Sequence, residues 1–228
     1  MPVRETGHLE IIMAYNIIDH RNIFEKIKDK KVIKDLKIAL KDFEPMVKDP
    51  RHLWNGRAIQ NFSLRPREAW ANWLICSVLQ KIKDPKITFG EDDKGDGFFI
   101  DRKSGTFIFT EHVSALDTPE GKKLPKGEQR IIDAIDLKIA RGPEYAKGKW
   151  LVVFFDGAGK FYRSKIRENI TSRHNFSSVF CVGLLDSRPK LYSYIATEFR
   201  DSYGVQSVTF RIDINGDFTD WKISQITL

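Results

Sequence analysis

The chain has 228 residues, of which 41% are hydrophobic and 30% are charged, a balance typical of a globular protein and not of a disordered one. Its formal net charge of +7 at pH 7 favours a polyanionic partner such as nucleic acid, although many basic proteins bind none. No apolar run approaches the roughly 18 residues that a membrane span needs, and the first residues lack a signal-peptide core, so we expect a cytoplasmic protein without a membrane partner.

The two cysteines, Cys76 and Cys181, lie inside apolar runs and form neither a CxxC motif nor a cluster with histidines. We expect them to be small buried side chains in a reducing compartment, and we expect no structural zinc. The length of the chain is sufficient for a sizeable core in one large domain.

The first predicted element is a helix over residues 9–44. Apolar side chains recur there at helical spacing, and lysines interleaved with Asp and Glu fill the other faces, which favours a solvated face over a DNA-binding surface. Pro45 and the segment 48–52 predict the end of this helix. A second helix is predicted over 66–82, with Pro66 in its first turn and a buried stripe made of Trp70, Trp73, Leu74, Val78 and Leu79.

A short strand over 86–90 and an acidic loop lead to a hairpin over 95–115, whose turn at 102–105 fits a type I turn with a glycine bulge. The next helix ends at Gly142-Pro143, and the apolar run 149–155 predicts a strand covered on both faces. Short strands alternate with one basic helical segment in the remainder. We therefore predict an α/β fold whose core, over residues 64–155, has the order helix, strand, strand, strand, helix, strand.

An acidic residue stands at each open end of the otherwise apolar hairpin, Asp96 on one strand and Glu111 on the other. If the turn is centred between residues 103 and 104, residues whose numbers sum to about 207 face each other, and Asp96 opposes Glu111 with Cβ atoms roughly 5 Å apart. A register shifted by one would oppose Asp96 to His112 instead.

Two carboxylates at that distance suit an oxygen-ligating cation such as Mg²⁺. Gly95 and Gly97 flank Asp96 and would leave room for a bulky ligand to approach. The competing interpretation is that Asp96 only ends a loop and that Glu111 points to solvent at a strand edge.

This arrangement resembles the PD-(D/E)XK nuclease superfamily, the restriction-endonuclease-like fold. The resemblance covers about residues 64–155 and is anchored in GDGFFI and FTEHV, where Asp96 matches the first acid of the family and Glu111 matches the second. It implies an α-β-β-β-α-β core with a mixed central sheet, a Mg²⁺ cofactor for which Mn²⁺ can substitute, and endonucleolytic hydrolysis of DNA. Double-strand cutting by this fold generally implies two active sites, and hence a homodimer.

The sequence departs from the family pattern two residues after Glu111, where Val113 replaces a lysine. His112 cannot fill in, because strand side chains alternate and it points to the opposite face, where a hydrogen-bonded histidine under the sheet is the simpler interpretation. Some members of the superfamily supply the missing cation from the next helix. Lys138 lies there on an apolar stripe, so it either extends outward to solvent or meets a buried carboxylate. Gln129, in the first turn of the same helix, is a second candidate.

Glu68, in the first turn of the helix over 66–82, matches a metal-binding glutamate that several branches of the superfamily place on the first core helix. Its other interpretation is a helix-stabilising role through the macrodipole. The resemblance implies that Asp96, Glu111 and Glu68 hold the metal, and that Lys138 orients the attacking water or stabilises the transition state.

A basic segment supplies the candidates for phosphate contacts away from the catalytic site: Arg163, Lys165, Arg167, Arg173 and His174. Basic surface helices are common, so a plain surface role is the alternative. No helix-turn-helix, zinc-finger or RNP signature is present, and the sequence specificity is therefore not predicted.

We predict three parts of one domain: a helical N-terminal extension over 1–62, a nuclease-like core over 63–160 and a β-rich C-terminal part over 161–228. The predicted function is metal-dependent hydrolysis of DNA phosphodiester bonds. One alternative is a catalytically inactive nuclease-like fold that acts as a nucleic-acid-binding or assembly module, which Val113 favours. Another is a β-rich ligand-binding protein in which the acidic pair is a coincidence.

Overall fold

The computed structural model describes residues 30–56, 62–91, 96–115, 123, 125–155, 160–200 and 207–226. The helices in these residues are α2 (Leu36–Lys48), α3 (Arg51–Asn55), α4 (Pro66–Ile82), α5 (Glu128–Ile139), α6 (Pro143–Ala146) and α7 (Arg163–Ile170). The strands are β1 (Ile87–Gly90), β2 (Phe98–Asp101), β3 (Phe107–Ser114), β4 (Trp150–Phe154), β5 (Ser178–Arg188), β6 (Leu191–Phe199), β7 (Val208–Asn215) and β8 (Trp221–Ile226). The predicted order from residue 64 to residue 155 is present, with the short helix α6 inserted before β4.

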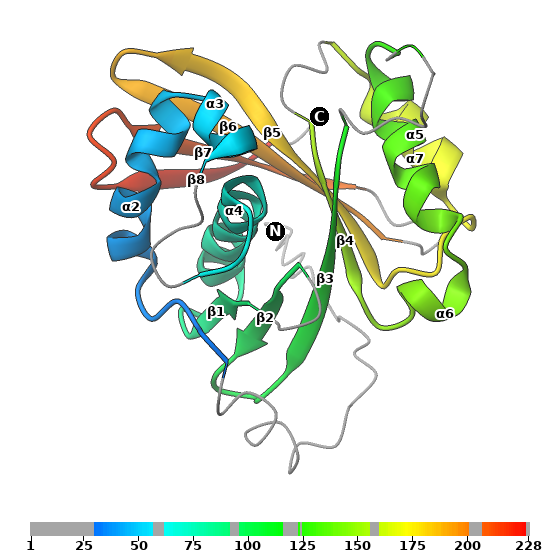
Figure 1. The fold of residues 1–228 in the computed structure, drawn as a ribbon, viewed down its shortest axis with the longest axis horizontal. Coiled ribbons are helices and arrows are strands. Elements are labelled where there is room, and N and C mark those ends of the chain that lie inside the picture. The colour runs from blue at the N-terminus through cyan, green and yellow to red at the C-terminus, as the bar shows by residue number, and fades with distance from the viewer. Residues whose placement is uncertain are drawn as a thin grey trace, which may run out of the picture.

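The strands form one mixed sheet in the order β1-β2-β3-β4-β5-β6-β7-β8, so strands that are neighbours in the sheet are also neighbours in the sequence (Figure 1). β3, β4 and β5 are parallel, whereas every other neighbouring pair is antiparallel. The two parallel pairs are connected through helices, α5 with α6 and then α7, as parallel strands require. The prediction of an α/β fold with a mixed sheet is confirmed.

Helices cover both faces of this sheet (Figure 1). α2, α3 and α4 pack on one face over one apolar core, and α5, α6 and α7 pack on the other face over a second core. The strand β4 contributes to both, because Trp150 and Val152 belong to the first core and Leu151 and Val153 to the second. The sequence 149–155 was predicted as a strand covered on both faces, and this is confirmed.

The central element of the first core is α4, which has the predicted bounds. A helix that is apolar on nearly all sides must be buried, and both Trp70 and Trp73 are fully inaccessible to solvent. Their rings stack with centroids 5.1 Å apart, and the Trp73 indole N–H donates to the Leu36 carbonyl at 2.8 Å. Because α4 contacts β1 and also β4–β8, the curled sheet closes around this helix.

The N-terminal prediction needs a correction. Residues 9–29 of the predicted helix 9–44 lie outside the described residues, and the helix in the remainder begins only at Leu36. The predicted end at Pro45 is wrong, since α2 continues to Lys48. The apolar face extends past the proline to Val47, which is buried, and packing of that last turn outweighs the one backbone hydrogen bond that Pro45 removes.

Cys76 and Cys181 are buried and free, as predicted. Burial raises the pKa of both thiols, which keeps them protonated and unreactive. No helix in the described part of the chain is long and apolar enough to cross a membrane.

Candidate functional site

The candidate site begins where β2 ends and β3 continues. Phe98 pairs with Phe109, Phe99 with Ile108 and Ile100 with Phe107, which is the predicted register and excludes the register shifted by one residue. A hydrogen bond from the Thr110 N–H to the Gly97 carbonyl (2.9 Å) carries this pairing one step further toward the open end. Asp96 and Glu111 therefore stand at the open end of the hairpin, as predicted.

The Asp96 side chain closes this end of the hairpin. Its Oδ2 accepts a hydrogen bond from the His112 N–H at 2.6 Å. The main-chain carbonyl of Asp96 accepts hydrogen bonds from the Thr110 hydroxyl and from the side-chain amide of Asn72 on α4, each at 3.3 Å. Asp96 is thus tied both to β3 and to the central helix, and it does more than end a loop.

Gly97 does not open the site to a ligand, contrary to the prediction. Its φ of +114° lies in the region that favours glycine, and an added Cβ would come within 2.8 Å of the Asn72 amide nitrogen and 2.9 Å of the Gly90 carbonyl. The glycine is required because α4 and β1 approach the backbone closely at this point. Gly95 lies outside the described residues.

Three donors enclose the Glu111 carboxylate. Lys149 Nζ lies 2.7 Å from Oε1, Lys138 Nζ lies 3.4 Å from Oε2, and the Tyr145 hydroxyl also donates to Oε2. Burial alone would raise the pKa of Glu111, but the hydrogen bonds from Lys149 and Tyr145 and the charge of Lys138 outweigh it and hold the pKa below its usual range. Of the two interpretations of Lys138, the second therefore holds: its side chain meets a buried carboxylate.

The two lysines at Glu111 and a third cation, Arg141, gather around the ring of Tyr145. The charged groups of Lys138, Arg141 and Lys149 lie 5.7, 5.1 and 4.5 Å from the ring centroid. Burial, and then the hydrogen bond to Glu111, raises the pKa of Tyr145, so its hydroxyl remains a donor. We call Lys138, Arg141, Tyr145 and Lys149 the Tyr145 cluster.

Sequence reasoning found only Lys138 among the members of the Tyr145 cluster. Tyr145 is positioned by α6, a helix of four residues that is too short to give a periodic signal. Lys149 is positioned by a strand pairing that the sequence alone does not give. Glu111 pairs with Leu151 in the parallel ladder of β3 and β4, and a residue two positions before Leu151 shares its face of the sheet.

Glu68 lies at the start of α4 and near Asp96. Its carboxylate accepts a hydrogen bond from the Arg65 N–H at 3.1 Å, which supports the helix-stabilising interpretation. Burial, and then the negative charge of Asp96, raises the pKa of Glu68, and the Arg65 guanidinium at 3.9 Å does not offset this. The carboxylates that repel each other are thus Asp96 and Glu68, while the charge of Glu111 is balanced by lysines.

His112, Val113 and Gln129 direct their side chains elsewhere. His112 Nε2 lies 3.1 Å from Asn72 Oδ1 on the α4 face, so the predicted hydrogen-bonded histidine under the sheet is confirmed. Burial is the main cause that lowers its pKa to about 3, and the ring is neutral near pH 7. Val113 belongs to the second apolar core. Gln129 donates to Asp133 on the exposed side of α5 at 2.6 Å.

Most of the side chains that were predicted to contact phosphate instead interact with other groups of the protein. Lys165 and Arg173 form ion pairs with carboxylates of α5 at 2.7 and 3.0 Å, and Arg163 donates to a hydroxyl of β7. Arg167 is half-buried. His174 is only 4% exposed, which removes it from the predicted surface cluster.

A complete metal-ligand set is not formed in the described residues. No group of three or more His, Cys, Asp and Glu side chains there is close enough to hold a metal ion. The donor chemistry nevertheless fits Mg²⁺ at Asp96 and Glu68, because Mg²⁺ retains several waters and needs only one or two carboxylates together with phosphate oxygens. A cation at this pair would also relieve the repulsion that raises the pKa of Glu68.

Comparison with known proteins gives no relative from which to assign these roles. No family model, curated protein or solved structure matches the chain.

Proposed function

We propose that this protein is a metal-dependent nuclease that hydrolyses DNA phosphodiester bonds at Asp96, Glu111, Glu68 and Lys138. The observation that carries the proposal is the ion pair between Lys138 of α5 and Glu111 of β3, with Nζ and Oε2 3.4 Å apart. This ion pair places the ammonium group of Lys138 beside Glu111, the second acid of the motif. An active nuclease that has Val113 in place of the usual lysine needs such a cation from another element.

The path of the chain supports a restriction-endonuclease-like core. α4 precedes the three antiparallel strands β1–β3, and α5 leads to β4, which lies parallel to β3. This is the α-β-β-β-α-β connection that the resemblance implies. β5–β8 extend the same sheet beyond that core.

We assign Asp96 and Glu68 as the Mg²⁺ ligands, with Mn²⁺ as a substitute, because Glu68 is partly buried near the negative charge of Asp96 and both effects raise its pKa. Such an ion supplies an activated water and neutralises charge on the phosphate. Glu111 has a different role in this assignment. Its carboxylate holds Lys149 and Lys138 beside the site, at 2.7 and 3.4 Å.

The Tyr145 cluster is the part of this site that suits a phosphate group. Around one ring it presents three cations, Lys138, Arg141 and Lys149, and the carboxylate bound to the cluster is that of Glu111. Hydrolysis joins a water oxygen to phosphorus and breaks the bond to the leaving sugar oxygen, and negative charge grows on the remaining phosphate oxygens. Positioned ammonium groups stabilise that charge through charge-assisted hydrogen bonds.

A specific observation favours the second candidate function, a nuclease-like fold that binds nucleic acid without cleaving it. Both oxygens of Glu111 already accept hydrogen bonds from Lys149, Tyr145 and Lys138. A metal at Glu111 would have to displace one of these donors, whereas a phosphate could bind the cluster with the carboxylate in place. In this second function the protein would bind DNA at the cluster without cleaving it.

Incubation of supercoiled plasmid with the full chain separates the two functions. We expect nicked or linear DNA with Mg²⁺ or Mn²⁺ and none with EDTA. Asp96→Asn and Glu68→Gln, which preserve shape and remove charge, should each reduce cleavage by about a hundredfold. Asp42→Asn, an exposed position on α2, is the matched control.

Cleavage that survives in Asp96→Asn would contradict the proposed nuclease. DNA retardation in a gel without cleavage in either metal would support the binding module instead. We also propose a homodimer, because cutting both strands needs two sites; sedimentation of the free protein and of its DNA complex measures the oligomeric state directly.

A further inference from the structure

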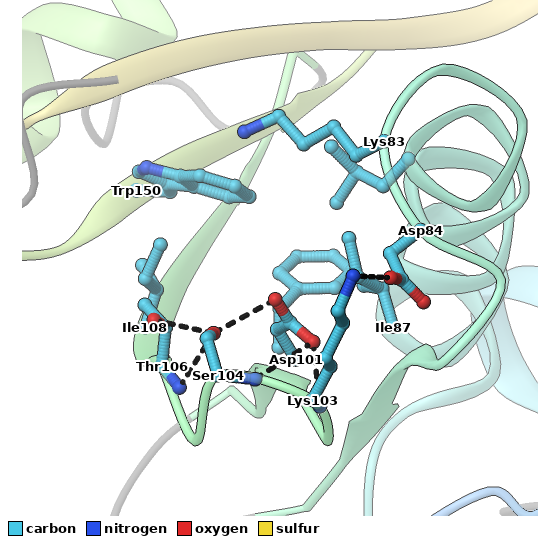
Figure 2. Close-up of a pocket in the computed structure, with 11 residues that line it drawn as sticks. Lys83, Asp84, Ile87, Asp101, Lys103, Ser104, Thr106, Ile108 and Trp150 are labelled. Atoms are coloured by element: carbon cyan, nitrogen blue, oxygen red, sulfur yellow. Dashed lines mark hydrogen bonds and ion pairs between the residues drawn. The ribbon is translucent and has the colours of Figure 1, made fainter. Parts of the chain in front are cut away.

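A concave site lies on the face of the sheet that α4 covers, near the closed end of the β2–β3 hairpin (Figure 2). It has a volume of about 590 Å³ and is formed by the end of α4 and by β1–β4. Trp150 lines it, and Trp150 follows Lys149 directly, so the two side chains point to opposite faces of the sheet. The cavity is therefore separate from the Tyr145 cluster.

One side of the cavity is apolar. Leu79 of α4, Ile87, Phe99 and Ile108 of the first three strands, and Trp150 line it. Trp150 is 3% exposed, and its ring centroid lies 5.4 Å from that of Phe99. A fixed indole beside aliphatic side chains is a suitable surface for a flat ring of a ligand.

The carboxylates of the cavity are engaged in the turns that carry them. Asp101 accepts from the Lys103 N–H at 2.8 Å and from the Ser104 hydroxyl at 2.7 Å. Asp84 accepts from the Lys86 N–H at 2.8 Å and lies 3.6 Å from Lys103 Nζ. These groups shape the rim of the cavity and leave little capacity to recognise a cationic ligand.

Lys83 supplies the opposite chemistry. Its side chain extends from the end of α4 over the cavity toward Trp150 (Figure 2). Burial is the largest influence on the amine and lowers its pKa to about 8, although the nearby Glu198 and Asp101 act in the opposite direction. An ammonium group that has lost part of its hydration is stabilised by an anion placed beside it.

We propose that this cavity binds a small amphipathic anion, a flat ring that carries one acidic group, with the ring against Trp150 and the acidic group at Lys83. The volume falls within the roughly 300–1,000 Å³ of small-molecule sites. An inorganic anion would not contact the apolar wall, and a neutral ring would not use the positive charge of Lys83. The proposal is independent of nuclease activity, since none of these residues belongs to the Tyr145 cluster.

A pair of fluorescent probes with the same ring system tests the proposal: 8-anilinonaphthalene-1-sulfonate is anionic, and N-phenyl-1-naphthylamine is neutral. Titration of the full chain at pH 7 should show one site per chain, with the anionic probe bound about tenfold more tightly. Lys83→Met should remove that preference, and Lys83→Arg should restore most of it. Lys86→Met, an exposed position outside the cavity, should bind as the unmodified protein does. Each variant is first checked for cooperative thermal unfolding.

A measurement on the unmodified protein covers the case in which Lys83→Met does not fold. The preference for the anionic probe should fall as the pH rises through about 8, because Lys83 loses its charge there. Other charged groups also face the cavity or Lys83, namely Asp84, Asp101, Lys103, Glu198 and Arg200. If Lys83→Met folds, an anion preference that does not change with pH in this variant assigns the pH dependence of the unmodified protein to Lys83. Equal affinity of the two probes for the unmodified protein, or an anion preference that is insensitive to pH and to Lys83→Met, would overturn the proposal.

Discussion

Replacing Lys149 by methionine measures how much the cations around Glu111 contribute to stability. Lys149 Nζ lies 2.7 Å from Glu111 Oε1, and the side chains are 29% and 13% exposed. A hydrogen bond to a charged group contributes about 1.5–3 kcal/mol, and the partial exposure of Lys149 places this one at the lower end, so we expect the free energy of unfolding to fall by about 1.5 kcal/mol. Methionine keeps most of the methylene chain beside the Tyr145 ring, so the loss reports on the ammonium group.

Urea denaturation followed by circular dichroism provides the measurement. Lys147→Met, at an exposed position two residues away, should change stability by less than about 0.5 kcal/mol. Lys138→Met should cost less than Lys149→Met, because its Nζ lies farther from the Glu111 carboxylate, at 3.4 Å. Equal stability of Lys149→Met and Lys147→Met at pH 7 would refute this account of the ion pair.

The pH dependence of the same variant adds a second test with a definite sign. The folded-state pKa of Glu111 is depressed, so the stability that it contributes is present above the unfolded value of about 4.3 and is lost as the pH falls through the folded value. The difference between the unmodified protein and Lys149→Met should therefore shrink in acid. A difference that does not shrink at all as the pH falls below the unfolded value would mean that Lys149 acts through packing and not through its charge.

Three further predictions concern single side chains. His112 has a folded pKa of about 3 against an unfolded value of about 6.5, so the stability of the protein should fall by about 3 kcal/mol between pH 6.5 and pH 4 as the unfolded state binds a proton. Urea denaturation of His112→Gln and of the unmodified protein over this range measures the effect. Identical pH slopes for the two proteins would contradict it. Glu68→Gln should unfold at a slightly higher temperature than the unmodified protein at pH 7, because the folded state disfavours the ionised carboxylate, and this gain should disappear below about pH 4. A lower melting temperature of the variant at pH 7 would mean that the hydrogen bond from the Arg65 N–H to Glu68 dominates. Arg141→Gln should weaken DNA binding and reduce the slope of log affinity against log salt concentration by about 0.9. Arg173→Gln should have a smaller effect, because the guanidinium of Arg173 is paired with Asp136. Fluorescence anisotropy of labelled DNA measures both, and a larger effect of Arg173→Gln would indicate that DNA binds near α7.

The hairpin could be predicted from the sequence because local turn chemistry sets its register. Asp101 accepts from the N–H groups of Lys103 and Ser104, and Gly105 has a φ of +72° that closes the bulge. The register of every residue pair in β2 and β3 follows from that turn. α4 could be predicted for a similar reason, since Pro66 marks its start and its apolar side chains continue without a break.

The directions of the acidic side chains could not be predicted in the same way. Register places Asp96 opposite Glu111, but their partners come from elements that are distant in sequence. Asp96 accepts a hydrogen bond from the β3 backbone and lies near Glu68 of α4, while Glu111 pairs with Lys149, directly before β4. Hairpin periodicity contains no information about these tertiary contacts, so the predicted pair of carboxylates separates into two electrostatic environments.

Val113, which stands where the resembling nuclease motif has a lysine, is consistent with this division. Val113 is 6% exposed and belongs to the core that includes Ile131 and Ile135, where a lysine would bury its ammonium group among aliphatic side chains. Lys138 approaches Glu111 from the last turn of α5, and Lys149 approaches it from the residue directly before β4. Their side chains are partly exposed, at 12% and 29%. The site keeps cations beside its second acid while position 113 completes the core. Val113 is therefore no evidence for an inactive site, and the distinction between nuclease and binding module depends on whether Asp96 and Glu68 bind the metal.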